Sequence, residues 1–276
     1  MTVPLLIAAP AAAAGLAYLN ARTSFTYDLN LFAALGAGTI KSRLAERKDR
    51  ANLFYTLESH AQARSTANHP FIVYEGRSWT YKEVYDIVLK YGTWLKVTYN
   101  IAPKEIVAMD FMNSPQFAFI WLGLWSIGAH PAFINYNLTG KPLLHCVRTS
   151  TARLLIIDKE VRGSFSQEVL DELASLSFRD GKGPVEVTFF TLEIESQVLS
   201  TEGVREPDSS RSGAKAHEMA NLIYTSGTTG LPKPAIVSWN KGLIGGNFVS
   251  FWMGCKRKDR FYTVCETGSM FIYNAR

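Results

Sequence analysis

The sequence predicts an α/β fold with a mostly parallel sheet and helices on its faces. From about Asn52 onward, short apolar runs typical of strands alternate with segments whose apolar residues recur at helical spacing. Such alternation is typical of strand–helix–strand units, which build parallel sheets. The composition suits a folded protein, because 47% of the 276 residues are hydrophobic and 19% are charged. We therefore expect an α/β domain over residues 51–276, preceded by a different kind of segment over residues 1–50.

The N-terminal segment, residues 1–50, is predicted to be a membrane anchor with a basic juxtamembrane end. Val3–Leu19 carries no charge over 17 residues, which is the short limit for a bilayer span, and it is alanine-rich with Pro10 and Gly15. No Lys or Arg precedes it, which disfavours a secretory signal peptide. A buried core helix stays open as an alternative, but we favour the anchor. Leu29–Ile40 is a second apolar patch, too short to span a bilayer but able to lie in its interface.

Basic residues in the first fifty positions occur only after the first apolar run. They are Arg22, Lys41, Arg43, Arg47, Lys48 and Arg50. The positive-inside tendency then places the main domain in the cytosol, on the endoplasmic reticulum, a peroxisome, a lipid droplet or the plasma membrane. Three cysteines without metal-binding spacing fit a reducing compartment. We expect a membrane partner and no nucleic-acid partner.

The predicted domain begins with a strand pair and a capped helix. Two short runs, Phe71–Tyr74 and Ser78–Thr80, predict strands joined by a turn. Thr80 and Glu83 match a capping box, in which each side chain accepts a backbone hydrogen bond from the other residue. Apolar residues at helical spacing then predict a helix as far as Leu95.

Further strands and helices are predicted to alternate through the middle of the chain. The strands are expected at Ile106–Met112, Ala132–Ile134, Leu154–Ile157 and Val185–Thr191. The helices are expected at residues 115–127, Gly140–Thr149 and Val161–Ala174. Ser114 followed by Pro115 is typical of a helix start, and Thr139 can cap the second helix. Glu202–Ala216 lacks periodicity and predicts a surface loop.

The stretch Asn221–Trp239 carries the candidate chemistry. Apolar runs at Leu222–Tyr224 and Ala235–Val237 predict two strands, and a turn rich in glycine and hydroxyl side chains lies between them, ending in Lys233. Glycine lets backbone amides turn inward, and amides, hydroxyls and an ammonium together suit a polyphosphate. The spacing is not Walker A, so an ordinary turn stays open for Ser-Gly-Thr-Thr-Gly alone. The candidate binding residues are Tyr224, Thr225, Ser226, Gly227, Thr228, Thr229, Gly230, Leu231, Pro232 and Lys233.

The whole of this stretch resembles the nucleotide-binding signature of the adenylate-forming (AMP-binding) enzymes. The resemblance implies that the loop wraps the β- and γ-phosphates of ATP and that Lys233 belongs to it. Pro234 departs from the usual glycine or alanine and removes an amide donor. Met109–Val147, with NSPQF, WLGLWSIGAHPAFIN and NLTGKPLLHC, resembles the very-long-chain acyl-CoA synthetase and fatty-acid transport protein branch. Within this stretch we expect core or structural roles for Trp121, Trp125, Phe133, His130 and His145.

The resemblance implies a fatty acid–CoA ligase that uses ATP, Mg²⁺ and coenzyme A, with a fatty acid as partner and a homo-oligomer as one expected state. Members of this family are roughly twice as long, and the later motifs of the family do not occur here. We therefore expect an N-terminal fragment of the enzyme's large domain, whose catalytic residues stay unknown and whose last dozen residues depart from the family pattern. A non-catalytic membrane-bound nucleotide- or lipid-binding fragment is the alternative.

Overall fold

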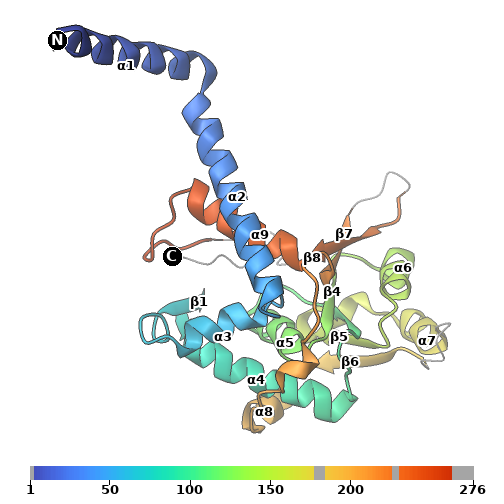
Figure 1. Cartoon of the computed structure of the whole chain (residues 1–276). Helices are drawn as coiled ribbons and strands as arrows, with labels where there is room; N and C mark the ends of the chain where they lie inside the picture. Colours follow the sequence, from blue (N-terminus) through green and yellow to red (C-terminus); the bar gives the residue numbers. More distant parts are fainter. Residues whose placement is uncertain (1–2, 177–183, 226–229, 263–276) are drawn as a thin grey trace.

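A six-stranded sheet in the order β6–β5–β3–β4–β7–β8 forms the centre of the molecule. The computed structural model describes residues 3–176, 184–225 and 230–262, with backbone alone for residues 3–8 (Figure 1). The strands of the large sheet are β3 (Ile106–Asp110), β4 (His130–Ile134), β5 (Leu154–Asp158), β6 (Glu186–Phe190), β7 (Met219–Thr225) and β8 (Lys233–Ser238). Strands β1 (Pro70–Tyr74) and β2 (Arg77–Thr80) pair separately.

The sheet is parallel except at one edge, as the alternation of strands and helices predicted. Strands β3, β4, β5, β6 and β7 run parallel, and β8 pairs antiparallel with β7. The helices that connect and flank them are α1 (Val3–Thr23), α2 (Phe25–Arg47), α3 (Phe54–Gln62), α4 (Tyr81–Tyr99), α5 (Pro115–Ser126), α6 (Gly140–Ser150), α7 (Gln167–Ser175), α8 (Leu192–Ser200) and α9 (Trp239–Trp252). Two 3₁₀ turns, η1 (Lys159–Ser164) and η2 (Asp208–Ser210), lie in the loops.

Local capping signals set several helix starts. At α4, the Thr80 side chain accepts from the Glu83 N–H at 3.2 Å while the Glu83 carboxylate accepts from the Thr80 N–H at 2.7 Å, which confirms the capping box. At α5, Ser114 Oγ accepts from the Phe117 N–H at 3.2 Å. The cap predicted for α6 is wrong, because the Thr139 side chain makes no capping hydrogen bond.

Two other predictions differ from the structure. The single helix expected over Val161–Ala174 is divided into η1 and α7, because Ser166 accepts from the Val169 N–H at 3.4 Å and starts a new helix there. The loop expected over Glu202–Ala216 is partly an interior segment. Its Arg211 is 3% exposed, and its guanidinium lies 4.7 Å from the centre of the Phe54 ring.

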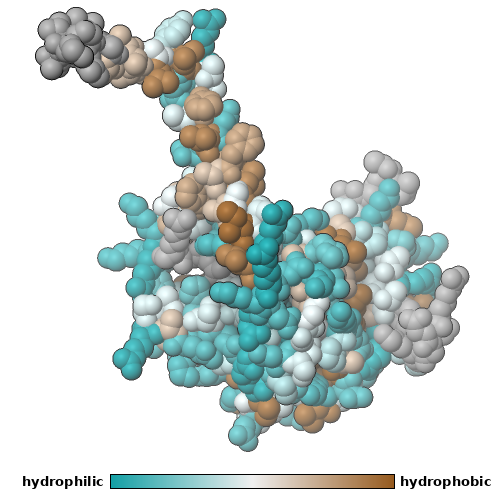
Figure 2. All heavy atoms as spheres, viewed as in Figure 1, coloured by the Kyte–Doolittle hydropathy of each residue, from teal (hydrophilic) through white to brown (hydrophobic). Residues whose placement is uncertain are grey.

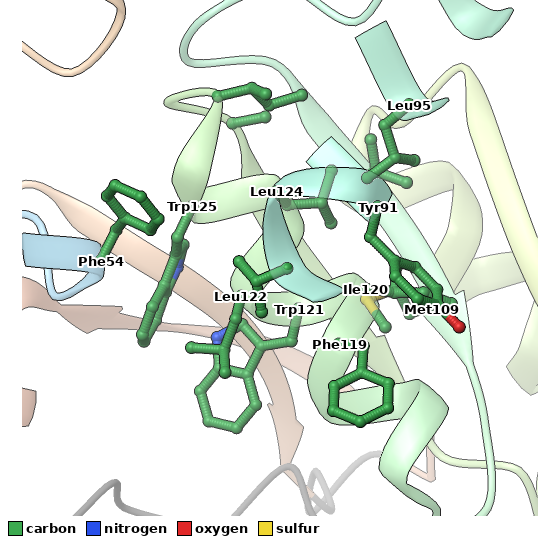
Figure 3. Close-up of a cluster of buried hydrophobic side chains, with 14 of the residues drawn as sticks. Phe54, Tyr91, Leu95, Met109, Phe119, Ile120, Trp121, Leu122, Leu124 and Trp125 are labelled. Atoms are coloured by element: carbon green, nitrogen blue, oxygen red, sulfur yellow. The ribbon is translucent and has the colours of Figure 1, made fainter. Parts of the chain in front are cut away.

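Each face of the sheet has its own hydrophobic core. On the aromatic face, helices α3, α4 and α5 bury large rings (Figure 3), among them Phe54, Tyr91, Trp94, Phe117, Trp121, Trp125, Phe133 and Trp239. On the aliphatic face, α6, η1 and α7 bury branched side chains, among them Leu143, Leu144, Val147, Leu155, Ile157, Val161, Val169 and Leu173. The core positions predicted for Trp121, Trp125 and Phe133 are confirmed, since each is at most 5% exposed.

The N-terminal helices α1 and α2 extend away from the sheet domain, and apolar side chains lie along them (Figures 1 and 2). The structure does not support the bilayer span predicted over Val3–Leu19, because none of the helices it describes is long and apolar enough to cross a membrane. Abundant alanine, with Pro10 and Gly15, limits the hydrophobicity of that run.

Helix α2 is attached to the domain through α9. Small residues make this contact: Gly38 of α2 is buried, and a Cβ added to it would lie 3.1 Å from the Cα of Ile244. Gly246 of α9 is buried as well. Lys41 Nζ also donates to Asn247 Oδ1 at 2.6 Å. The two helix backbones can therefore approach closely at Gly38, and the ring of Tyr27 on α2 lies 6.0 Å from that of Trp252 on α9.

Candidate functional site

The candidate phosphate loop joins the antiparallel strands β7 and β8. The strands predicted at Leu222–Tyr224 and Ala235–Val237 are confirmed and extend by one to three residues at each end. Thr225 pairs with Lys233 at the end of the hairpin, and Thr225 Oγ1 donates to the Lys233 carbonyl oxygen at 3.4 Å. Four of the ten candidates, Ser226, Gly227, Thr228 and Thr229, lie outside the described residues.

The described candidates divide into an outward and an inward set. Thr225, Gly230 and Lys233 are exposed at the open end of the hairpin. Gly230 has φ of +85°, a conformation that glycine adopts without strain and that turns the chain back toward β8. An exposed ammonium and hydroxyl beside such a turn can meet an anion, and contact of these residues with phosphate stays a prediction.

Tyr224 belongs to the inward set. Its phenol O–H donates to the Cys146 carbonyl oxygen on α6 at 2.6 Å, and it lies 3.3 Å from Thr149 Oγ1. Burial raises the pKa of Tyr224 to about 12, so the phenol stays protonated and keeps its donor. The side chain therefore anchors the start of the loop to α6, a role that the sequence prediction did not distinguish from phosphate contact.

His145 anchors the other end of the same loop. Its Nε2 lies 3.1 Å from the Pro232 carbonyl oxygen, and because a carbonyl only accepts, Nε2 carries the proton in this contact. Leu231 is exposed and Pro232 is half-buried beside this contact. Helix α6 thus binds both flanks of the loop. The sequence contains one hint of this pairing, since His145 and Thr149 lie four residues apart and share a helix face.

Pro234 stands in β8 opposite Tyr224. Strand β8 is the edge strand of the sheet that the structure describes, and edge strands are where a sheet accepts a residue without an N–H donor. The departure from the usual family residue therefore fits the local backbone.

A rigid layer supports β7 from the aromatic face. Trp125 Nε1 donates to the carbonyl oxygen of Ala220 in β7 at 2.9 Å, and the Trp125 ring lies 5.1 Å from that of Trp239, the first residue of α9. Asn52 Nδ2 donates to the Trp125 carbonyl oxygen at 3.1 Å. Burial lowers the pKa of the nearby His130, which favours the neutral ring and fits the structural role expected for it.

The part of the chain that the structure describes contains no metal-binding cluster of side chains near the hairpin. Within those residues, no group of three or more His, Cys, Asp or Glu side chains could hold a metal ion. The described part of the site consists of a backbone turn, exposed hydroxyl and ammonium groups, and two anchoring contacts from α6. Such groups suit an anion.

A comparison with protein families assigns the family of this chain. Residues 59–271 match the family model described as AMP-binding enzyme. The chain belongs to the AMP-binding enzyme family. The matched region contains the hairpin and lies within the predicted domain over residues 51–276.

Curated relatives of this AMP-binding chain include several fatty acid transport proteins. It is 30% identical over 271 residues to a very long-chain fatty acid transport protein of Cochliobolus heterostrophus, covering 95% of this chain and 40% of the relative. It is 37% identical over 174 residues to the very long-chain fatty acid transport protein of Saccharomyces cerevisiae, covering 61% of this chain and 25% of the relative. The chain thus spans at most two fifths of either relative.

Solved structures share the fold at lower sequence identity. A fatty acyl CoA synthetase of Mycobacterium tuberculosis aligns with a TM-score of 0.56 at 18% identity, over 70% of this chain and 35% of that one. An anthranilate CoA ligase in complex with anthranoyl-AMP aligns with a TM-score of 0.55 at 19% identity, over 69% of this chain and 34% of that one. The α/β fold of this AMP-binding chain is therefore that of part of an adenylate-forming enzyme. The last dozen residues, predicted to be off-pattern, lie outside the described residues.

Proposed function

We propose that this chain carries the ATP-binding hairpin of a fatty acid–CoA ligase. In that reaction a fatty carboxylate attacks the α-phosphorus of ATP and displaces pyrophosphate, which leaves an acyl adenylate. The thiol of coenzyme A then attacks the acyl carbon and releases AMP. The observation that carries the proposal is the hairpin end, where Gly230 turns the chain at positive φ next to the exposed Thr225 and Lys233. The family match and the names of the relatives support the same reading.

The proposed chemistry is electrostatic. Negative charge grows on the leaving pyrophosphate, and an ammonium with inward-facing amides stabilises such charge best when both are held in place beforehand. Lys233 would supply the ammonium. The contacts of α6 with Tyr224 and Pro232 would supply the fixed position, because they hold the two flanks of the loop.

Mg²⁺ and coenzyme A also take part in the proposed reaction. Mg²⁺ is usually bound by one or two carboxylates together with substrate phosphates. We therefore expect Mg²⁺ to enter bound to the phosphates of ATP. Coenzyme A would be the acyl acceptor of the second step.

Nucleotide binding by the 276-residue chain tests the central step. Titration with MgATP in a calorimeter should show binding that Lys233→Ala weakens roughly tenfold, the size expected for losing one charge-assisted contact to phosphate. Lys82→Ala is the matched control, because Lys82 lies on α4, is exposed and pairs with Asp86 at 2.8 Å. Equal affinities for the Lys233→Ala variant and the unmodified chain would contradict the proposal.

ATP–pyrophosphate exchange separates the ligase from a second function. The alternative is a non-catalytic nucleotide- or lipid-binding fragment at a membrane, which is favoured by the exposed apolar side chains of α1 and α2. Exchange that depends on a long-chain fatty acid and disappears in Lys233→Ala supports the ligase. MgATP binding without exchange supports the fragment.

We also propose that α1 and α2 lie on a membrane surface, with the sheet domain on the cytosolic side. Exposed apolar side chains on these helices include Leu16, Leu19, Phe25, Phe32 and Ile40, each at least 55% exposed. The basic residues that follow would face anionic lipid headgroups. Co-sedimentation with phosphatidylserine vesicles tests this, and Phe25→Glu with Phe32→Glu should reduce the bound fraction. Retention of the full bound fraction would refute it.

A further inference from the structure

A cavity of about 330 Å³ lies at the carboxyl edge of the sheet, on the side away from the phosphate-loop hairpin. This volume is in the range of sites for small molecules. The residues that follow β3, β5 and β6 form most of its wall, and Tyr74 and Glu75 of the β1–β2 turn complete it. In the sheet order, β4 separates these three strands from β7. The cavity and the hairpin are therefore different places on the same edge.

The cavity lies where the chain leaves two neighbouring strands toward opposite faces. Strands β3 and β5 are parallel neighbours. Helix α5 follows β3 and packs in the aromatic core, whereas η1 and α7 follow β5 and pack in the aliphatic core. In open α/β sheets, the crevice outside the carboxyl ends of strands at such a switch point is the general place for a ligand.

The interior wall of the cavity is aromatic. Phe111, just after β3, and Phe190, at the end of β6, are each 4% exposed, and their ring centres lie 6.1 Å apart. Leu192 and Met112 also line the cavity and are 61% and 41% exposed. Such a wall can pack against the apolar part of a ligand.

The polar part of the wall is acidic. Its charged side chains are Glu75, Asp158, Glu160 and Glu195, with the single ammonium of Lys159. Lys159 Nζ lies 3.7 Å from Glu160 Oε1 and so offsets a carboxylate that is already at the surface. Phosphates and carboxylates would meet net repulsion here, so the cavity does not suit a nucleotide or a fatty acid.

Asp158 is the innermost of these carboxylates, at 8% exposed. Burial raises the pKa of its carboxyl, and the N–H groups of Glu160 and Met112 oppose that rise by donating to it. A carboxylate has about four acceptor positions, so Asp158 can accept from a ligand as well as from the backbone. A positive ligand group would compensate the cost of burying this charge.

We propose that this cavity binds a small organic cation, with its ammonium group held by the Asp158 and Glu195 carboxylates and its apolar body packed on Phe111 and Phe190. The site is independent of the proposed nucleotide site, so either can fail without the other. Its ligand class is a primary amine attached to an aromatic or alkyl group.

Binding of three matched probes to the 276-residue chain tests the ligand class. Phenethylamine carries the ammonium, phenethyl alcohol is its uncharged analogue, and hydrocinnamate is an anionic one. Calorimetry or ligand-observed NMR should show phenethylamine binding at least roughly tenfold tighter than the other two, the ratio that a hydrogen bond to a charged group supplies. Equal binding of the three probes, or no binding of phenethylamine, overturns the proposal.

Charge-neutral variants test the residues. Asp158→Asn keeps a side chain that can cap η1, and Glu195→Gln keeps an oxygen that can accept from Gln116 Nε2, which donates to Glu195 at 2.8 Å. Each should weaken phenethylamine binding roughly tenfold, while Glu168→Gln, an exposed carboxylate change on α7, should leave it unchanged.

Thermal melting separates a ligand role from a purely structural one. If Asp158 only caps η1 and Glu195 only accepts from Gln116, Asp158→Asn and Glu195→Gln change the melting temperature and leave the affinity for phenethylamine unchanged, which overturns the assignment. If Asp158→Asn fails to fold, Glu195→Gln decides the outcome by itself.

Discussion

The two faces of the central sheet support the phosphate-loop hairpin in different ways. The aromatic face holds β7 from below through Trp125, which donates to the Ala220 carbonyl oxygen and packs on Trp239. The aliphatic face holds the loop itself, through His145 and the contact of Tyr224 with α6. The aromatic face therefore contributes mainly to the stability of the domain, and the aliphatic face mainly to the position of the loop. Changes on the aromatic face should therefore unfold the protein, whereas polar changes on α6 should alter the site.

Trp125→Ala should give the largest effect. Trp125 is 1% exposed, and its removal leaves a cavity and deletes the hydrogen bond to the Ala220 carbonyl oxygen. We expect a loss of about 3–5 kcal/mol in the free energy of unfolding, measured by urea denaturation. Trp252→Ala is the control, because Trp252 is 44% exposed and its change should cost far less. Similar losses for the two variants would show that Trp125 does not carry the aromatic face.

Leu143→Ala tests the aliphatic face in the same way. Leu143 is fully buried on α6, and leucine-to-alanine changes in cores cost about 2–5 kcal/mol. We expect a value below that of Trp125→Ala, because no hydrogen bond is lost with the side chain. Urea denaturation at one pH compares the two directly, and a larger loss for Leu143→Ala would reverse the assignment of the main support.

The partly buried ion pair of Glu58 with Arg205 adds a pH test of the aromatic side. Burial would raise the pKa of the Glu58 carboxyl, but hydrogen bonds from Arg205 and Tyr85 lower it below the ordinary value of 4.5. The folded state therefore gains stability above that value and loses it as the pH falls through the lowered pKa. We expect Glu58→Gln to cost about 2 kcal/mol at neutral pH and to flatten this acid-side loss.

The aliphatic side provides a matched control for that pair. Arg148 and Glu172 lie 3.1 Å apart with side chains 56% and 49% exposed, so Glu172→Gln should change the stability by less than about 0.5 kcal/mol. Unfolding followed from neutral pH to pH 3 checks both variants. If the Glu58→Gln variant still loses the same stability as the pH falls, other carboxyl groups cause that loss.

His145→Ala should give the smallest change in stability and a selective change in the site. We expect MgATP affinity to fall by roughly threefold to tenfold, the equivalent of one ordinary hydrogen bond, with little change in urea denaturation. His145→Gln places an N–H donor at a similar distance and should restore most of the affinity. Equal MgATP affinity of the His145→Ala variant and the unmodified chain would show that the His145 contact of α6 does not contribute to the site.

Local signals in the sequence predicted the strands and two of the helix starts. The capping box at Thr80 and the Ser114–Pro115 start need contacts within four residues, so the sequence alone contains them. Helix α9 was not predicted, because Gly242, Gly245 and Gly246 oppose a helix by propensity. Tertiary packing overrides that preference: a Cβ added to Gly242 would lie 2.7 Å from Leu53 Cδ1, and α9 also packs on α2 at Gly38.

The candidate site was predictable only in part for the same reason. The turn and its cation follow from Gly230 and Lys233, which are neighbours along the chain. The anchoring of Tyr224 depends on residues 75 and 78 positions away, and that of Pro232 on a residue 87 positions away. Such pairings are set by the packing of α6 on the sheet, which no local pattern encodes. The anchor expected for Val3–Leu19 failed because length and hydrophobicity were both at their lower limits.

Strand β8 has a consequence for self-association. An unprotected strand edge can recruit the same strand of another molecule and grow into an aggregate. Pro234 interrupts the row of N–H donors on β8, and the exposed Lys233 beside it adds a charge that repels a second copy. Proline at position 234 can thus disfavour edge-to-edge pairing of β8 between two molecules. The neighbouring Lys233 is exposed and can still contact a ligand.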